Sequence, residues 1–223
     1  NIPLAFVQPG EAVDVRNVQN GQIFVNGKQV FYLDGEEHDS IPAYDTTPFD
    51  TYLENAVDYY STVKTLLYSE VPHNFSDIYV PNDIKFKTLN TVADEKMQSR
   101  SIEDLVVDHP SNIIIRGTGG IGKSMMMRHL FLHYAEKFSE CGKLPVLVPL
   151  KNFTAEVKNL EEFIFRAAYE FDHDLQFTNF ETLLKNWKCI ILLDGLDEIP
   201  TAARHHFDNC LVNFTKAYRR NHI

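Results

Sequence analysis

The eight most informative residues of the chain are Gly117-Thr118-Gly119-Gly120-Ile121-Gly122-Lys123-Ser124, which match the pattern GxxxxGK[ST] in full. Glycines lack the Cβ atoms that would keep backbone N–H groups away from phosphate oxygens. A helix that starts at Lys123 favours an anion at its N-terminus, because free N–H groups and the helix dipole point outward there. We therefore predict that residues 117–124 hold the phosphates of a nucleotide. The Lys123 ammonium would lie against the β- and γ-phosphates, and the Ser124 hydroxyl would face Mg²⁺.

Strand and helix patterns alternate on both sides of this loop. The expected strands are 112–116, 144–150 and 189–193, and the expected helices are 123–138, 160–169, 180–187 and 202–218. Residues 189–193 are apolar at every position, as in a parallel strand that is covered on both faces. The pattern predicts an α/β fold, a P-loop NTPase parallel sheet with flanking helices. We expect this sheet to be incomplete at the C-terminus and to be preceded by a small β-rich N-terminal region.

The first hundred residues have a different character. Residues 22–25 and 29–33 flank Asn26-Gly27, which is a strong signal for a two-residue hairpin turn. Apolar residues then recur at helical spacing over residues 49–68, which predicts one amphipathic helix. Two further expectations are a short extended piece at 77–81 and a loop at 90–100. The resulting division is 1–45 as a β-rich region of unknown role, 46–100 as a helical and linker segment, and 101–223 as the NTPase core.

Three carboxylates follow the apolar run 189–193, namely Asp194, Asp197 and Glu198. In open α/β sheets, ligands bind beyond the carboxyl ends of the strands. Asp194 is therefore placed to hold Mg²⁺ through its water shell. The alternative is structural, with Asp194-Gly195 as a turn and the two later acids at the start of the next helix. A complete phosphate loop about 70 residues earlier favours the magnesium role.

Residues 117–124 together with Leu193-Asp194-Gly195-Leu196-Asp197-Glu198 resemble the NACHT family, signalling NTPases of the STAND class that are related to NOD-like receptors. Sequences of that family are similar to this chain in placing a small residue after the magnesium aspartate and an acidic pair two positions later. The resemblance implies that Asp197 or Glu198 polarises the attacking water, and it leaves open which one does so. It covers roughly residues 78–223, where 144–150 looks like the family's second strand and 78–81 is similar to a segment near the base.

The resemblance also implies a function. We expect a module that binds ATP or ADP with Mg²⁺, hydrolyses ATP slowly, and belongs to a self-oligomerising sensor in innate immunity or antiphage defence. ATP is favoured over GTP because no NKxD-type segment is present. In the family, a strand with a sensor arginine and then a winged helix come next. We therefore interpret this chain as the N-terminal part of the NTPase domain, truncated before the sensor-1 strand, with weak or no hydrolysis alone.

The composition of the chain indicates which partners and which cellular compartment to expect. A net charge of −10 argues against direct nucleic-acid binding, which relies on cationic side chains that displace counterions. Three scattered cysteines without a CxxC pair indicate a reducing compartment, hence a cytoplasmic location. No apolar stretch approaches the length of about 18 residues that a membrane span needs. Asn1 is interpreted as an internal position of a longer chain.

Two other classes of P-loop protein remain as alternatives. A kinase for a small acceptor would need a lid with arginines near the transferred phosphate, and no arginine-rich segment is present. A nucleic-acid-dependent motor would need a basic groove, and the negative net charge of the chain argues against one. Two histidine pairs, His129 with His133 and His205-His206, lack the partners at zinc spacing that a metal site needs. Both pairs are therefore interpreted as ordinary helix residues.

Overall fold

The computed structural model describes residues 18–19, 22–25, 28–33, 36–39, 47–63, 73–81, 84–85, 99–103, 112–219 and 221–223. The chain divides into two compact units, Asn1–Asp45 and Thr46–Ile223. The first unit contains a four-stranded antiparallel sheet with the strand order β1-β2-β3-β4. Its strands are β1 Val18–Gln19, β2 Gln22–Val25, β3 Lys28–Leu33 and β4 Glu36–Asp39. The turn expected at Asn26-Gly27 lies outside the described residues.

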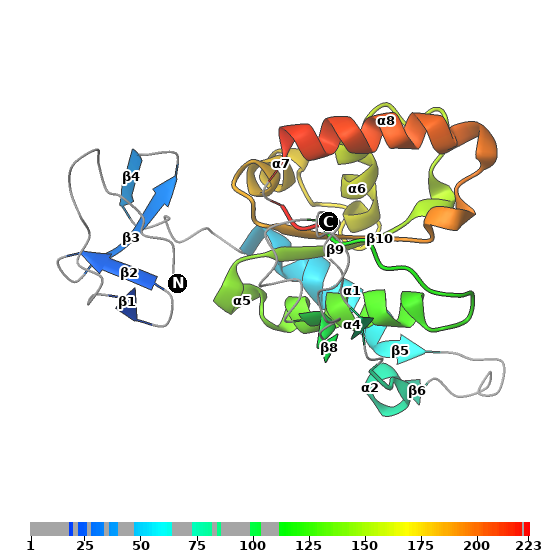
Figure 1. Ribbon diagram of the computed structural model, residues 1–223, viewed down its shortest axis with the longest axis horizontal. Coiled ribbons are helices and arrows are strands. Elements are labelled where there is room, and N and C mark those ends of the chain that lie inside the picture. Colours follow the sequence, from blue (N-terminus) through cyan, green and yellow to red (C-terminus); the bar gives the residue numbers. More distant parts are fainter. Residues whose placement is uncertain are drawn as a thin grey trace, which may run out of the picture. The chain divides into compact units, whose positions relative to one another are not determined.

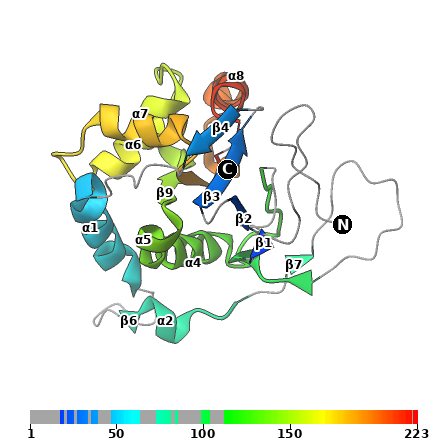
Figure 2. The same cartoon turned by 90° about the vertical axis from the view of Figure 1, so that its left-hand side faces the viewer.

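The second unit is built around two parallel strands with helices on both faces (Figure 1). Strands β9 (Leu144–Pro149) and β10 (Cys189–Asp194) pair in parallel, from Cys189 opposite Leu144 to Asp194 opposite Pro149. Figures 1 and 2 show α6, α7 and α8 over one face and α1, α4 and α5 over the other. The helices are α1 Asp50–Ser61, α4 Lys123–Glu136, α5 Phe138–Cys141, α6 Leu160–Tyr169, α7 Phe177–Lys185 and α8 Thr201–Ala217. The predicted α/β class with a parallel sheet is thus confirmed.

Burial explains why polar and apolar residues do not alternate along the two strands. The first five residues of β9 and the first four of β10 are buried, because both faces of the sheet are covered by helices. Helix α6 spans the residues predicted for it and buries Leu160, Phe163, Ile164 and Ala168 against this sheet. Its start is capped by Asn159, whose side-chain oxygen accepts from the Glu162 N–H at 2.8 Å. The cap and the apolar stripe therefore set where α6 begins and which of its faces is buried.

A short third segment, Asn221-His222-Ile223, runs beside β10. His222 forms a parallel bridge with Ile190, and the Ile191 N–H donates to the His222 carbonyl at 2.8 Å. On its other side, the Ile223 carbonyl accepts from the Ile113 N–H at 2.9 Å. The order of neighbouring segments is therefore 112–116, 221–223, β10, β9. This order brings the segment that leads into the glycine-rich loop to the same layer as β10.

The expected strand at 112–116 is wrong as a regular strand, because these residues do not pair with a neighbour as a strand does. Only Ile113 of this segment has a backbone hydrogen bond to the neighbouring segment 221–223 among the described residues. A strand needs a partner along its whole length, and the partner here consists of three residues. Ile114, next to Ile113, is 67% exposed.

The segment before the loop also differs from expectation. The helix predicted for 49–68 follows a 3₁₀ turn, η2 (Thr47–Phe49), and ends at Ser61, because β-branched Thr62 and Val63 leave the helix to form β5. β5 (Thr62–Val63) pairs with β6 (His73–Asn74). Part of the extended piece predicted at 77–81 belongs to helix α2 (Phe75–Ile78), and the last two residues of the loop predicted at 90–100 form β8 (Ser99–Arg100) against β7 (Ile84–Lys85).

The remaining elements shift only at their ends. The strand predicted at 144–150 gives way after Pro149 to a 3₁₀ turn, η3 (Leu150–Asn152), and a second turn, η4 (Leu196–Glu198), follows β10. Helix α4 ends before Phe138, which instead begins α5. None of the helices in the described part of the chain combines the length and the apolar character that a membrane crossing requires.

Candidate functional site

The glycine-rich loop leads directly into a helix, which is the arrangement expected around residues 117–124. Helix α4 begins at Lys123, and Gly122 is its N-cap with a φ of 94°. Gly120 has a φ of 78°. Residues with a Cβ adopt such angles at a cost, so the path of the loop depends on glycine at these positions. Residues 117–121 are exposed, and their backbone is open to a ligand from solvent.

Lys123 bends back over the loop that precedes it. Its ammonium donates to the Gly117 carbonyl at 3.0 Å and to the Thr118 carbonyl at 3.2 Å. The cation is thereby held above the loop at the start of α4, and no side chain caps the first turn of that helix. Ser124 follows in the first turn and is exposed. A fixed ammonium, an uncapped helix start and an exposed hydroxyl form a set of groups suited to an anion with a bound cation.

The acidic residues lie where β10 ends. Asp194 is the last residue of the strand and is half-buried, whereas Asp197 and Glu198 are exposed in η4. The chain turns at Gly195, which has a φ of 80°, and the Glu198 N–H donates to the Gly195 carbonyl at 2.9 Å. Ile199 is 5% exposed and anchors the far end of the turn in the core. The structure therefore gathers all three carboxylates within one tight turn at the carboxyl end of a buried strand.

Glu198 folds back over this turn. A Cβ atom added to Gly195 would stand 3.2 Å from the Glu198 carboxyl carbon and 3.4 Å from both of its oxygens. The backbone angle of Gly195 thus favours glycine after Asp194, and a Cβ atom there would also crowd the Glu198 carboxylate. Asp197 is not among the closest atoms to this position. The geometry distinguishes the two acids, which the sequence did not.

Sequence reasoning missed one residue that contacts the turn. Arg204, in the first part of α8, donates a hydrogen bond from its guanidinium to the backbone carbonyl of Leu196. Leu196 is the first residue of η4, directly before Asp197. An arginine eight positions after a leucine carries no local signal, because the contact exists only once α8 folds back toward the end of β10.

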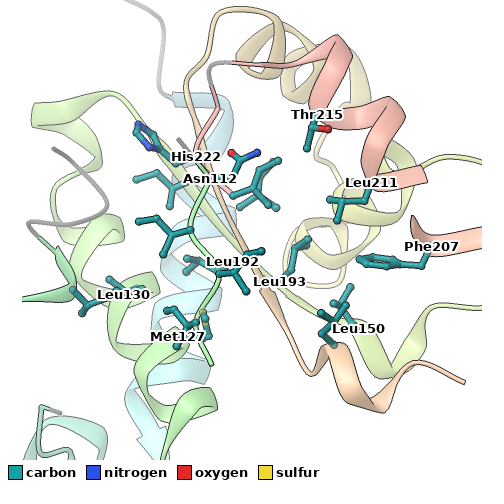
Figure 3. A pocket seen from close by; sticks show the side chains of 18 residues that line it. Asn112, Met127, Leu130, Leu150, Leu192, Leu193, Phe207, Leu211, Thr215 and His222 are labelled. Carbon is teal, nitrogen blue, oxygen red and sulfur yellow. The ribbon is translucent and has the colours of Figure 1, made fainter. Parts of the chain in front are cut away.

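A cavity of about 310 Å³ lies between the segment that precedes the glycine-rich loop and the end of β10. Ile114 and Ile115 line it from the segment before the loop, and Leu193 lines it from the end of β10 and Leu196 from the acidic turn. Figure 3 shows side chains from α4, β10 and α8 pointing into it, among them Met127, Leu192 and Leu211. Its lining is almost entirely apolar. It is therefore no place for phosphates or a cation, which need polar groups, and its lining includes neither residues 117–124 nor the three carboxylates.

The segment that was expected near a base packs on α4. The Tyr79 ring stacks on His129 with centroids 4.6 Å apart, and it stacks on Phe75 on its other side at 5.0 Å. His129 in turn is hydrogen-bonded to the Glu103 carboxylate. These contacts attach residues 79–81 to the helix that starts at the phosphate loop. A role in holding a base stays a prediction.

Comparison with known protein families identifies part of the chain. Residues 111–220 match the family model described as the NACHT domain. The matched segment contains the glycine-rich loop, Lys123, β9, β10 and the acidic turn, which are the features that carried the resemblance. A search of curated proteins finds no match for the chain.

Proposed function

We propose that the NACHT domain formed by residues 111–220 binds ATP and ADP together with Mg²⁺ and hydrolyses ATP slowly. A NACHT domain is a nucleotide-binding NTPase module, which is the basis of this proposal. The observation that carries the proposal is the Lys123 ammonium, which is held over the loop by the Gly117 and Thr118 carbonyls. A phosphate is the natural partner of a cation at an uncapped helix start. Residues 117–124 would hold the phosphates.

The donor set also fits a magnesium ion. Mg²⁺ prefers oxygen ligands and is held in proteins by one or two side chains together with phosphates. The Ser124 hydroxyl and the Asp194 carboxylate would supply these side chains. When bound, Mg²⁺ would neutralise charge that develops on the phosphates. We assign the water-polarising role to Glu198 rather than Asp197, because the Glu198 carboxylate folds back against Gly195, the residue next to Asp194.

Replacing Lys123 tests nucleotide binding. We expect Lys123→Ala to weaken binding of Mg²⁺-ADP and Mg²⁺-ATP by about 100-fold, because a charge-assisted contact to the phosphates is lost. Lys137→Ala is the matched control, since Lys137 is exposed just beyond the other end of α4 and should leave affinity unchanged. Isothermal titration calorimetry measures both. Equal affinity in the Lys123→Ala variant and the wild type would refute the proposal.

We infer a signalling role in the cytoplasm, in innate immunity or antiphage defence, with self-association controlled by the nucleotide. Support for this role is the family alone. Light scattering on the naturally encoded protein with ADP and with ATP tests the self-association. A mass that depends on the nucleotide in the wild type, but not in the Lys123→Ala variant, supports it, and a constant mass argues against it.

A further inference from the structure

An arginine of α8, the helix that follows the acidic turn, forms a hydrogen bond back to that turn. The guanidinium of Arg204 donates to the Leu196 carbonyl, and Arg204 is the fourth residue of α8. Leu196 stands between the sharp bend at Gly195 and the two exposed acids. The hydrogen bond therefore reaches the middle of the segment whose conformation decides where Asp197 and Glu198 lie.

The turn lies against η3 (Leu150–Asn152) and has few other polar supports. Its two ends are held by the Gly195 carbonyl, which accepts from the Glu198 N–H, and by the buried side chain of Ile199. The Leu196 side chain is 44% exposed, so packing holds this residue only in part. Within the described residues, neither Asp197 nor Glu198 forms a salt bridge. The Arg204 contact is thus the polar link that restrains the centre of the turn.

We infer that Arg204 is a positioning residue for hydrolysis: it holds the Leu196 carbonyl, and through it the acidic turn, at the end of β10. This inference rests on the proposed function, in which Glu198 polarises the attacking water. Arg204 acts through a backbone carbonyl and not through the nucleotide. An arginine suits this role because its planar guanidinium presents rigidly oriented donors, so that less freedom is lost when one hydrogen bond forms.

Arg204 is expected to affect the rate of hydrolysis but not the binding of nucleotide. In the proposed function residues 117–124 would hold the phosphates, whereas the Arg204 guanidinium is hydrogen-bonded to Leu196 in the acidic turn, so the affinity for ADP should not depend on Arg204. The rate of hydrolysis should depend on it, because a displacement of about 1 Å of a catalytic group costs up to about 100-fold in rate. A change in kcat without a change in ADP affinity is therefore the expected signature.

Three substitutions distinguish a hydrogen bond from a charge. Arg204→Met removes the donor and keeps much of the side-chain length, Arg204→Gln keeps a neutral donor, and Arg204→Lys keeps the charge. Lys216→Met is the matched control, because it removes a cation from the last turn of the same helix. In the naturally encoded protein, kcat and KM for ATP are measured together with the Kd for ADP. Thermal unfolding checks that each variant is folded.

We expect Arg204→Met to lower kcat about tenfold with an unchanged Kd for ADP, and Arg204→Gln and Arg204→Lys to recover most of the rate. Lys216→Met should behave as the wild type. Three results would overturn the inference: an unchanged kcat in Arg204→Met, a weaker ADP affinity in that variant, or recovery by lysine but not by glutamine. The last two would mean that Arg204 acts on the nucleotide by its charge. Absence of ADP binding or of hydrolysis in the wild type would refute the proposed function, and this inference with it.

Discussion

At the scale of single residues, Gly195 decides the shape of the acidic turn. Its backbone has a φ of 80°, which any other residue adopts only under strain. The Glu198 carboxyl also lies 3.2 Å from the position that a Cβ atom of residue 195 would take, so such an atom would crowd it. A substitution of Gly195 should therefore disturb both the backbone of the turn and the position of the Glu198 carboxylate.

Gly195→Ala should lower both stability and hydrolysis. The positive φ should cost about 1–2 kcal/mol in the free energy of unfolding, and the new methyl group should push the Glu198 carboxylate aside. Urea unfolding and the steady-state rate of ATP hydrolysis measure the two effects. Gly142→Ala is the matched control, because Gly142 has a φ of 60° at the end of α5, where its nearest neighbour is Lys188. It should lose similar stability and keep its activity, and an equal loss of activity in both variants would contradict the role given to Gly195.

At the scale of elements, Asn221 joins the end of α7 to the start of β10. It is 3% exposed, its side-chain oxygen accepts from the Cys189 N–H at 3.1 Å, and its side-chain nitrogen donates to the Leu184 carbonyl at 2.8 Å. A buried amide that satisfies two backbone groups is expensive to remove, because both groups lose their partners. This contact therefore helps to hold the segment 221–223 in its place beside β10.

Asn221→Ala should reduce the free energy of unfolding by about 2–3 kcal/mol, because buried backbone groups would be left without partners. Asn186→Ala is the control: its side chain also donates to a backbone carbonyl, that of Thr182, but it does so in solvent. It should change stability by about 0.5 kcal/mol or less. Denaturant unfolding followed by circular dichroism measures both variants. Equal losses would show that the burial of Asn221 does not matter.

At the scale of the whole molecule, the folded unit is larger than the NACHT match. The compact unit begins at Thr46, whereas the match begins at residue 111. Helix α1 is part of this unit, because Tyr52 is 1% exposed and its hydroxyl donates to the Pro145 carbonyl of β9 at 2.9 Å. Its ring also packs edge-on against Phe131 of α4. Burial accordingly raises the pKa of the Tyr52 hydroxyl well above its ordinary value.

Tyr52→Ala should therefore destabilise the whole unit. The loss of a fully buried ring should cost about 3–5 kcal/mol, as for other large aromatic residues replaced by alanine in a core. Tyr59→Ala on the same helix is the control, because Tyr59 is 61% exposed and should cost far less. A single cooperative unfolding transition with a lower midpoint is expected in calorimetry. A variant that loses only the helix signal, with the rest unfolding as before, would show that α1 is a separate element.

Local patterns were enough for several parts of this molecule. The limits of α6 follow from its apolar stripe and its Asn159 cap, and the start of α4 follows from the glycines and Lys123 that precede it. These features depend on residues close in sequence, whose spacing and backbone preferences can be read directly. The helix predicted over 49–68 ended early because Thr62 and Val63 pair with a segment about ten residues away.

The sequence by itself determined that residues 117–124 form a glycine-rich loop before a helix and that three acids follow a buried strand. Only the tertiary structure decided that Arg204 holds the Leu196 carbonyl, that Glu198 rather than Asp197 lies against Gly195, and that α1 packs on β9. The physical reason is the range of the interactions. Loop angles, caps and apolar stripes are local properties of the chain. The Tyr52–Pro145 contact joins residues 93 positions apart in sequence. The Arg204 and Glu198 contacts span only a few residues, but they depend on how the chain turns between β10 and α8.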